Sequence, residues 1–209
     1  MELSEWQEFD LIRRENNTQW SARLPKGITT RINIFKARFD LASRLSLLTF
    51  MPTYDDDTSG MYLAGTKLLL AYSAAEALLR SEDLFRARKK SYVGAWTLAR
   101  ANLANELRPV AKLILDSSDS HGNLDERMKA KLLKFYDSTK SDVMPLASAL
   151  RHIHAHGGLT ARSLTGALVD TSSNHAAAIS SLAQALLEKC DEKFSKLVKE
   201  ITICLKGNH

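Results

Sequence analysis

The stretch MYLAGTKLLLAYSAAEALLR, residues 61–80, decides the fold class of this 209-residue chain. Leucine and alanine dominate it, and both are strong helix formers. Apolar residues fall on nearly every side of a helix with 3.6 residues per turn, which is typical of a helix in the centre of a bundle. Lys67 and Glu76 interrupt this pattern. Glu76 shares a stripe with Tyr72 and Leu79, so we expect a half-buried carboxylate that needs a cationic or hydrogen-bonding partner.

The rest of the chain also predicts helices, and no stretch predicts a strand. Glycine (9) and proline (4) are scarce, which disfavours a loop-rich β fold. The motif Leu24-Pro25-Lys26-Gly27 and Pro52 end two of the helices. We therefore expect an all-α, up-and-down helical bundle, in which residues 1–52 form an N-terminal helical extension and residues 53–209 form the main domain. Apolar periodicity places further helices at residues 4–20, 29–50, 91–116 (with a possible bend at Pro109), 123–136, 143–156 and 174–205.

The net charge and the two cysteines bear on the binding partners and the cellular compartment that we expect for this protein. The formal net charge of +5 permits an anionic partner such as RNA without requiring one. Cys190 and Cys204 lie roughly 21 Å apart if they share one helix, so they cannot bridge each other. We expect a cytoplasmic protein, because the N-terminus lacks the apolar run of a signal peptide and no stretch is apolar enough to span a membrane.

Two short charged clusters, one acidic and one basic, are candidate binding sites. The triplet Asp55-Asp56-Asp57 resembles a metal site, but neighbouring residues on a helix point about 100° apart, so acidic residues at a helix N-terminus are the simpler interpretation. A basic cluster followed by Tyr92 and Trp96 suits RNA, through phosphate contacts and base stacking. The alternative is a solvated face whose aromatic residues point inward. The candidate RNA-binding residues of this cluster are Arg86, Arg88, Lys89 and Lys90.

The stretch RHIHAHGG, residues 151–158, holds half of the six histidines. His152 and His156 share a helix face at a spacing that suits zinc, but no cysteine and no suitably placed glutamate accompanies them. We therefore expect no metal ion. Arg151 and His156 match the pattern R-x(4–6)-H, with four residues between them, and this pattern occurs about once by chance in a chain of this composition. Its position is more informative, because it ends a short apolar helix and two glycines follow.

In this order of elements the chain resembles the HEPN superfamily of helical proteins. Ribonuclease members of that family carry R-x(4–6)-H near the end of the penultimate core helix, with a polar residue after the arginine, here His152. Their histidine is commonly followed by glycine, here Gly157. A similar Tyr/Ala-rich helix with an embedded glutamate lies upstream, here Ala71 to Glu76. The resemblance covers residues 54–206 in the order of elements and about seven residues in motif. His154 is not a usual feature of the motif.

The resemblance implies a metal-independent endoribonuclease that needs no cofactor and acts as a homodimer. His156 would be the general acid or base and Arg151 would stabilise the phosphate, with His152, His154 and Glu76 in support. It also implies a toxin or antiviral effector that cuts tRNA or mRNA, with a cognate antitoxin or regulatory partner. On a regular helix Arg151 and His156 lie roughly 140° apart, so a frayed helix end or a second subunit has to bring them together.

Three alternatives remain open at this point. The first is a non-catalytic HEPN module that binds RNA or a nucleotide. The second is a helical scaffold that binds a partner protein. In the third, the histidines only cap a helix and Arg151 forms an ordinary ion pair with Glu76.

Overall fold

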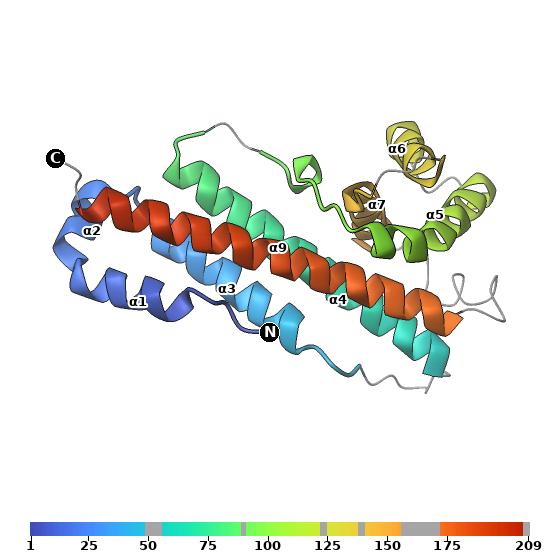
Figure 1. Cartoon of the computed structure of the whole chain (residues 1–209), viewed down its shortest axis with the longest axis horizontal. Coiled ribbons are helices and arrows are strands. Elements are labelled where there is room, and N and C mark those ends of the chain that lie inside the picture. The colour runs from blue at the N-terminus through green and yellow to red at the C-terminus, as the bar shows by residue number, and fades with distance from the viewer. Residues whose placement is uncertain (49–55, 89–90, 122–124, 138–140, 156–171, 207–209) are drawn as a thin grey trace.

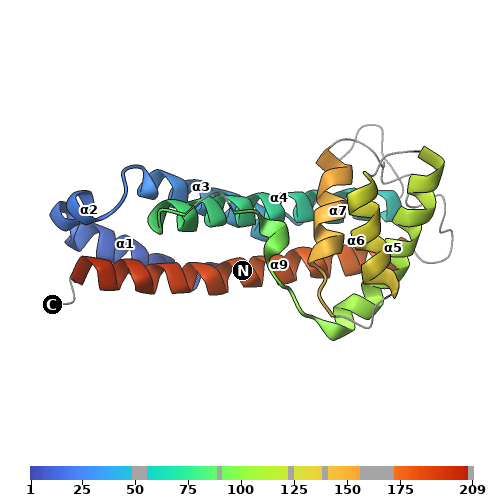
Figure 2. The same ribbon diagram turned by 90° about the horizontal axis from the view of Figure 1, so that it is seen from above.

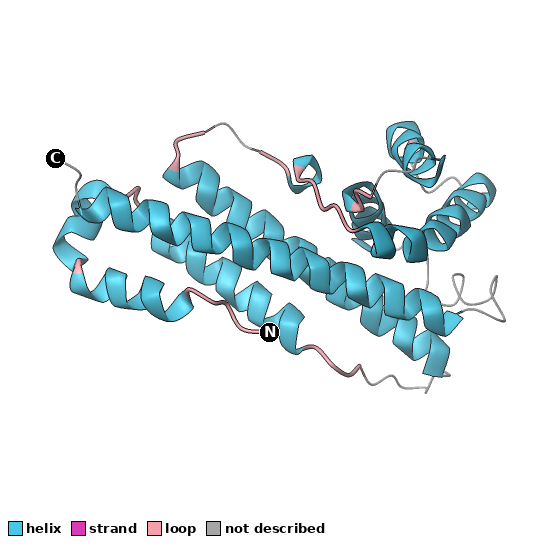
Figure 3. Cartoon of the chain, in the orientation of Figure 1, coloured by secondary structure: helices cyan, strands magenta, loops and turns pink. Residues whose placement is uncertain are grey.

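The computed structural model describes residues 1–48, 56–88, 91–121, 125–137, 141–155 and 172–206. Within these ranges the chain is almost entirely helical, and the only β pairing is an isolated bridge between Ala99 and Asp142 (Figure 3). The predicted all-α helical bundle is thus confirmed. None of the helices within the described ranges is long and apolar enough to cross a membrane.

Three long helices form the body of the molecule: α3 (Ile28–Arg44), α4 (Asp56–Phe85) and α9 (Ser172–Lys206). They lie side by side along the long axis, with α4 and α9 running in the same direction and α3 in the opposite one (Figures 1 and 2). The apolar stretch MYLAGTKLLLAYSAAEALLR, residues 61–80, is the middle of α4. Leu68, Ala71 and Leu78 are fully buried, as expected for a central helix.

The N-terminal helices α1 (Trp6–Glu15) and α2 (Asn17–Arg23) pack against α9 at one end of the body. An aromatic cluster holds them there. The ring of Phe194 on α9 lies 5.8 Å from Phe9, 6.1 Å from Trp6 and 5.4 Å from Phe35 of α3. Residues 1–48 therefore share one core with α4 and α9, while the predicted domain boundary at residue 52 stays a prediction.

Three further helices stand across the other end of α4 and α9: α5 (Ala101–His121), α6 (Glu126–Asp137) and α7 (Met144–Ala155) (Figure 2). α7 packs on α4 and α6, and α5 packs on α6 and α9. α7 buries Leu146, Leu150 and Ile153 on the face that turns inward. This packing places the arginine of RHIHAHGG next to the Tyr/Ala-rich part of α4.

The prediction of one helix over residues 91–116 is wrong for residues 91–100, which are not α-helical. A 3₁₀ turn, η1 (Val93–Ala95), comes first, and residues 97–100 are extended before α5 begins. The Arg100 N–H donates to the Ser141 carbonyl (2.8 Å), and the Val143 N–H donates to the Leu98 carbonyl (3.0 Å). Pairing with this distant segment satisfies the backbone groups that a local helix would otherwise have to satisfy.

The predicted helix over residues 4–20 is in fact two helices, divided at Asn16. The Asn16 side-chain amide donates to the Ile12 carbonyl (2.9 Å), and the Asn16 carbonyl accepts from the Trp20 N–H (2.7 Å). Asparagine often ends helices in this way, because its side chain competes for backbone hydrogen bonds. The break predicted at Leu24 to Gly27 is confirmed, and Gly27 has a φ of 86°, a conformation that favours glycine.

The helix predicted over residues 29–50, with its end at Pro52, is too long, because the backbone is already extended at Leu45 and α3 ends at Arg44. The remaining helix predictions agree with the structure to within five residues. α4 is longer than predicted at both ends and begins at Asp56, which fits the simpler interpretation of the acidic triplet. Asp55 lies outside the described residues. Cys190 and Cys204 both lie on α9 and are free thiols, as predicted.

Candidate functional site

The candidate site lies where α7 crosses α4. Arg151 of α7 points its guanidinium at Glu76 of α4, and Nη2 lies 3.2 Å from Glu76 Oε1. Both side chains are partly exposed, at 36% for Arg151 and 32% for Glu76. An ion pair that water reaches to this degree contributes little to stability. Arg151 is thus the cationic partner that the half-buried Glu76 requires, and the ion pair holds the guanidinium in one orientation at the surface.

Tyr72 lies one helical turn before Glu76 on α4, and its ring is buried beside Arg151. The Arg151 Cζ atom lies 5.8 Å from the centre of the Tyr72 ring, within cation–π range. The Tyr72 hydroxyl and the Ser148 hydroxyl of α7 share a hydrogen bond of 3.1 Å. Burial raises the pKa of Tyr72, so its phenol is neutral at physiological pH and can still donate a hydrogen bond.

The spacing along both helices explains why these groups meet. Tyr72 and Glu76 are four residues apart on α4, and Ser148 and Arg151 are three apart on α7, so each pair shares one helix face. α4 and α7 pack on each other, and the apolar neighbours of Glu76 and Arg151 in the sequence, Ala75 and Leu150, are fully buried.

The histidines of the motif are only partly described. His152 follows Arg151 on α7, and its side chain is partly buried. His154 belongs to α7 by its backbone, and its side chain lies outside the described residues, as does all of His156. The predicted Arg151/His156 pair and the zinc alternative both depend on these residues and stay predictions. Among the described side chains, no group of three or more metal-ligating residues comes together.

A second aromatic residue borders the same surface from η1. The Tyr92 ring and the Ser148 hydroxyl both lie against Gly94, where an added Cβ would be 3.0 Å from Tyr92 Cε2 and 3.1 Å from Ser148 Oγ. The Lys131 ammonium of α6 lies 6.0 Å from the centre of the Tyr92 ring. The sequence marks Tyr92 as an aromatic residue near a basic cluster, but only the fold places it beside Ser148 and Lys131.

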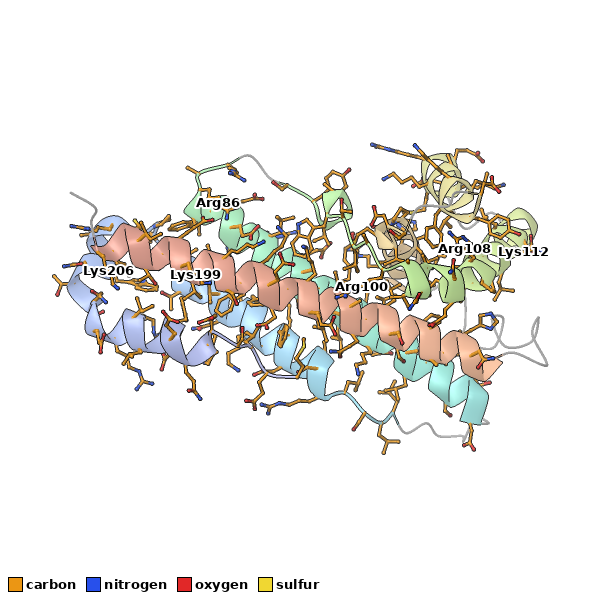
Figure 4. All side chains as sticks on the ribbon, viewed as in Figure 1. Arg86, Arg100, Arg108, Lys112, Lys199 and Lys206 are labelled. Carbon is orange, nitrogen blue, oxygen red and sulfur yellow. The ribbon has the colours of Figure 1, made fainter. Side chains whose placement is uncertain are left out.

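The predicted basic cluster is divided by the structure. Arg86 directly follows the last residue of α4 (Figure 4). It forms a two-pronged pair with Glu200 of α9, whose carboxylate oxygens lie 2.9 Å from Nε and 2.7 Å from Nη2. This pair raises the pKa of Arg86 and occupies the groups that a phosphate would need. Arg88 is exposed, and Lys89 and Lys90 lie outside the described residues. A role of Arg86 in RNA binding would require the pair with Glu200 to break.

Beneath Arg86 lies a buried carboxylate. The Glu82 side chain is only 5% exposed, and its Oε2 lies 3.9 Å from Arg86 and 3.8 Å from Lys193 of α9. Burial raises the pKa of Glu82, and the two cations oppose that effect. Lys193 also lies 4.7 Å from the centre of the Trp96 ring, which turns inward. These residues join the end of α4 to α9, so we interpret them as structural.

An open groove of about 500 Å³ runs between the extended residues 97–100 and α9. Its charged side chains pair with one another. Arg100, which Figure 4 labels, lies 2.7 Å from Glu188, and Lys189 lies 2.8 Å from Glu192. Hydrogen bonds from Lys189 and Lys196 lower the pKa of Glu192 to about 2. Arg151 is not among the lining residues, so this groove is separate from the α4–α7 site.

Comparison with known proteins adds no assignment, since no family model, no curated protein and no solved structure matches this chain. The interpretation of the site therefore rests on its own residues.

Proposed function

We propose that this protein is a metal-independent endoribonuclease whose active site includes the Arg151/Glu76 surface. One observation carries the proposal. Arg151 of the R-x4-H pattern and Glu76 of the Tyr/Ala-rich helix are 75 positions apart in sequence, yet they pair at 3.2 Å. These residues belong to the two motif segments that resemble HEPN ribonucleases. Their pairing leaves a fixed, partly exposed guanidinium at the end of α7.

RNA supplies its own nucleophile for this reaction. The 2′-hydroxyl attacks the adjacent phosphorus, the bond from phosphorus to the 5′-oxygen breaks, and a 2′,3′-cyclic phosphate and a 5′-hydroxyl remain. One group must take the proton of the 2′-hydroxyl and another must give a proton to the 5′-oxygen. His156 suits either task, because histidine titrates near neutral pH. Arg151 would bind the non-bridging oxygens and stabilise the charge that develops on them.

A homodimer fits this chemistry. The reaction needs two proton transfers, and the motif offers one His156 in each chain. Two copies that bring their α7 ends to one cleft would supply two Arg151/His156 pairs. Such an enzyme would suit a toxin or antiviral effector that cuts tRNA or mRNA and is held in check by a cognate antitoxin.

A non-catalytic RNA- or nucleotide-binding module is the second candidate. The pair between Arg151 and Glu76 favours it, because a phosphate has to compete with the Glu76 carboxylate for the guanidinium. In such a module, Glu76→Gln should tighten RNA binding, since it removes the competing charge. In the enzyme, the same substitution should lower kcat, because Arg151 loses the group that orients it.

The test is cleavage of labelled RNA in the presence of EDTA. We expect the wild type to cut and leave 2′,3′-cyclic phosphate ends. Arg151→Ala should slow cleavage by about 10²–10³-fold and His156→Ala by about 10²–10⁴-fold. Arg13→Ala is a matched control, because Arg13 is also 36% exposed and lies 2.7 Å from a carboxylate, that of Asp10. This variant should cut like the wild type.

Two outcomes would contradict the proposal. Cleavage that EDTA abolishes would exclude the metal-independent mechanism, and cleavage that survives in both Arg151→Ala and His156→Ala would place the active site elsewhere. RNA binding without cleavage by the wild type would favour the binding module. A protein that neither binds nor cuts RNA would favour the helical scaffold.

A further inference from the structure

Tyr92 is the one aromatic side chain among the described residues that is mostly exposed, at 59% of its surface. The aromatic residues of the core are buried, including Trp96, which follows Tyr92 after the short η1 turn. An exposed aromatic ring loses the hydrophobic free energy that burial would provide. A ring held open at the surface is, however, what a stacking partner needs.

The position of Tyr92 joins it to the α4–α7 site. The ring edge and the Ser148 hydroxyl both pack closely against Gly94, which allows this approach because glycine has no side chain. Ser148 in turn shares a hydrogen bond with Tyr72, whose ring lies under Arg151. A continuous row of polar and aromatic groups, in which Tyr72 is buried, therefore leads from Arg151 to Tyr92.

Three cationic side chains on α6 extend this row of groups beyond Tyr92. Arg127, Lys131 and Lys134 are spaced by four and three residues, so they share one face of the helix. Lys131 lies 6.0 Å from the Tyr92 ring, near the outer limit of a cation–π contact. At this distance the contact is weak, and the ammonium can turn to a phosphate without losing much free energy.

We infer that Tyr92 is a stacking platform for one unpaired nucleobase of single-stranded RNA, with Lys131 and its neighbours on α6 binding the adjacent phosphates. An exposed ring beside a basic face is the combination that single-stranded nucleic acids recognise, because every base has a π-face and every linkage is anionic. The inference rests on the proposed function in one respect: it places the bound base next to the phosphate that Arg151 would hold. A duplex cannot use this subsite, since its bases are already stacked.

The experiment measures binding of a fluorescent 2′-O-methyl RNA oligomer, which cannot be cut because its 2′-oxygen is blocked. We expect Tyr92→Ala to weaken binding by roughly 5- to 150-fold and Tyr92→Trp to keep it, because the indole ring also stacks. Leu133→Ala is the matched control, since Leu133 is also a large exposed side chain and lies on α6. It should bind like the wild type.

Two further arms separate the base from the phosphates. With an oligomer of abasic sugars, the wild type and Tyr92→Ala should bind equally, because no base remains to stack. Lys131→Ala should weaken binding to both oligomers and reduce the slope of log affinity against log salt by about 0.7. Lys206→Ala is its control, since Lys206 lies at the opposite end of the molecule from α6 (Figures 1 and 4).

The inference is refuted if Tyr92→Ala binds the single strand as tightly as the wild type does, or if it loses equal affinity for the abasic oligomer. It is also refuted if the wild type binds neither oligomer, or binds a duplex as tightly as the single strand. The proposed function can fail separately. Base-dependent binding through Tyr92, together with no cleavage of unmodified RNA, would exclude the enzyme and leave the stacking subsite in place.

Discussion

Phe194→Ala is expected to destabilise the protein by about 4–5 kcal/mol, near the top of the range for a buried phenylalanine. The side chain is fully buried on α9, and its ring lies within 6.1 Å of three other rings, those of Trp6, Phe9 and Phe35. Aromatic pairs contribute about 0.5–1.5 kcal/mol each beyond their buried area. The substitution removes all three pairs and leaves a cavity between the N-terminal helices and the body.

Phe39→Ala provides the matched control. Phe39 is also fully buried, and in the described part of the chain its ring pairs with Phe35 alone, at 5.8 Å. We therefore expect Phe194→Ala to cost about 1–3 kcal/mol more than Phe39→Ala, the value of two further ring pairs. Both free energies of unfolding come from urea titrations followed by far-UV circular dichroism and by tryptophan fluorescence.

The two probes also test whether the N-terminal helices unfold with the body. Two of the three tryptophans, Trp6 and Trp20, lie in the aromatic cluster, so in a Trp96→Phe background the fluorescence follows this end of the molecule, while circular dichroism follows all helices. Coincident transitions are expected in the wild type, since residues 1–48 share one core with α4 and α9. Equal costs for Phe194→Ala and Phe39→Ala, or an early separate fluorescence transition in the wild type, would refute this reasoning.

Three other predictions concern α4 and α9. Arg86→Ala removes a cation facing the buried Glu82 and should destabilise the protein by about 1–3 kcal/mol. This destabilisation should be smaller at acid pH, because the raised pKa of Glu82 lets its carboxyl become neutral there. Urea titrations at two pH values measure the difference. The pKa of Glu192 is about 2 in the folded protein, against an ordinary value of 4.5. The ionised carboxylate therefore stabilises the fold fully above about pH 4.5, and this stabilisation is lost as the pH falls through 2. Glu192→Gln should flatten the acid limb of the curve of stability against pH. Burial raises the pKa of Cys190, so a thiol reagent should modify the folded protein at Cys204 and reach Cys190 only after unfolding, as mass spectrometry of the labelled protein would show.

The control for Arg86→Ala is Arg14→Ala, because Arg14 pairs with Asp10 while remaining 73% exposed. A surface pair of this kind should contribute less than about 1 kcal/mol. Equal effects of the two substitutions would show that Glu82 does not depend on Arg86. A Glu192→Gln variant with an unchanged acid limb, or rapid labelling of Cys190 in the folded protein, would contradict the other two predictions.

Much of the helical structure can be predicted from the sequence, because helix signals are local. The periodicity of apolar residues locates α3, α4, α6, α7 and α9, and the Pro25 to Gly27 stop is found where the residues indicate it. The prediction fails at residues 91–100, where hydrogen bonds to residues 141–143 replace a local helix. It also fails at Asn16, where one side chain competes with the helix backbone.

The sequence by itself determined the fold class, the central position of α4 and the need of Glu76 for a partner. Only the tertiary structure decided which partners the charges have. Glu76 meets Arg151, and Arg86 meets Glu200 instead of standing free in a basic cluster. Periodicity tells which face of a helix is buried, but the docking of one helix on another brings distant side chains together. The open ring of Tyr92 beside Ser148 and Lys131 follows from the same docking.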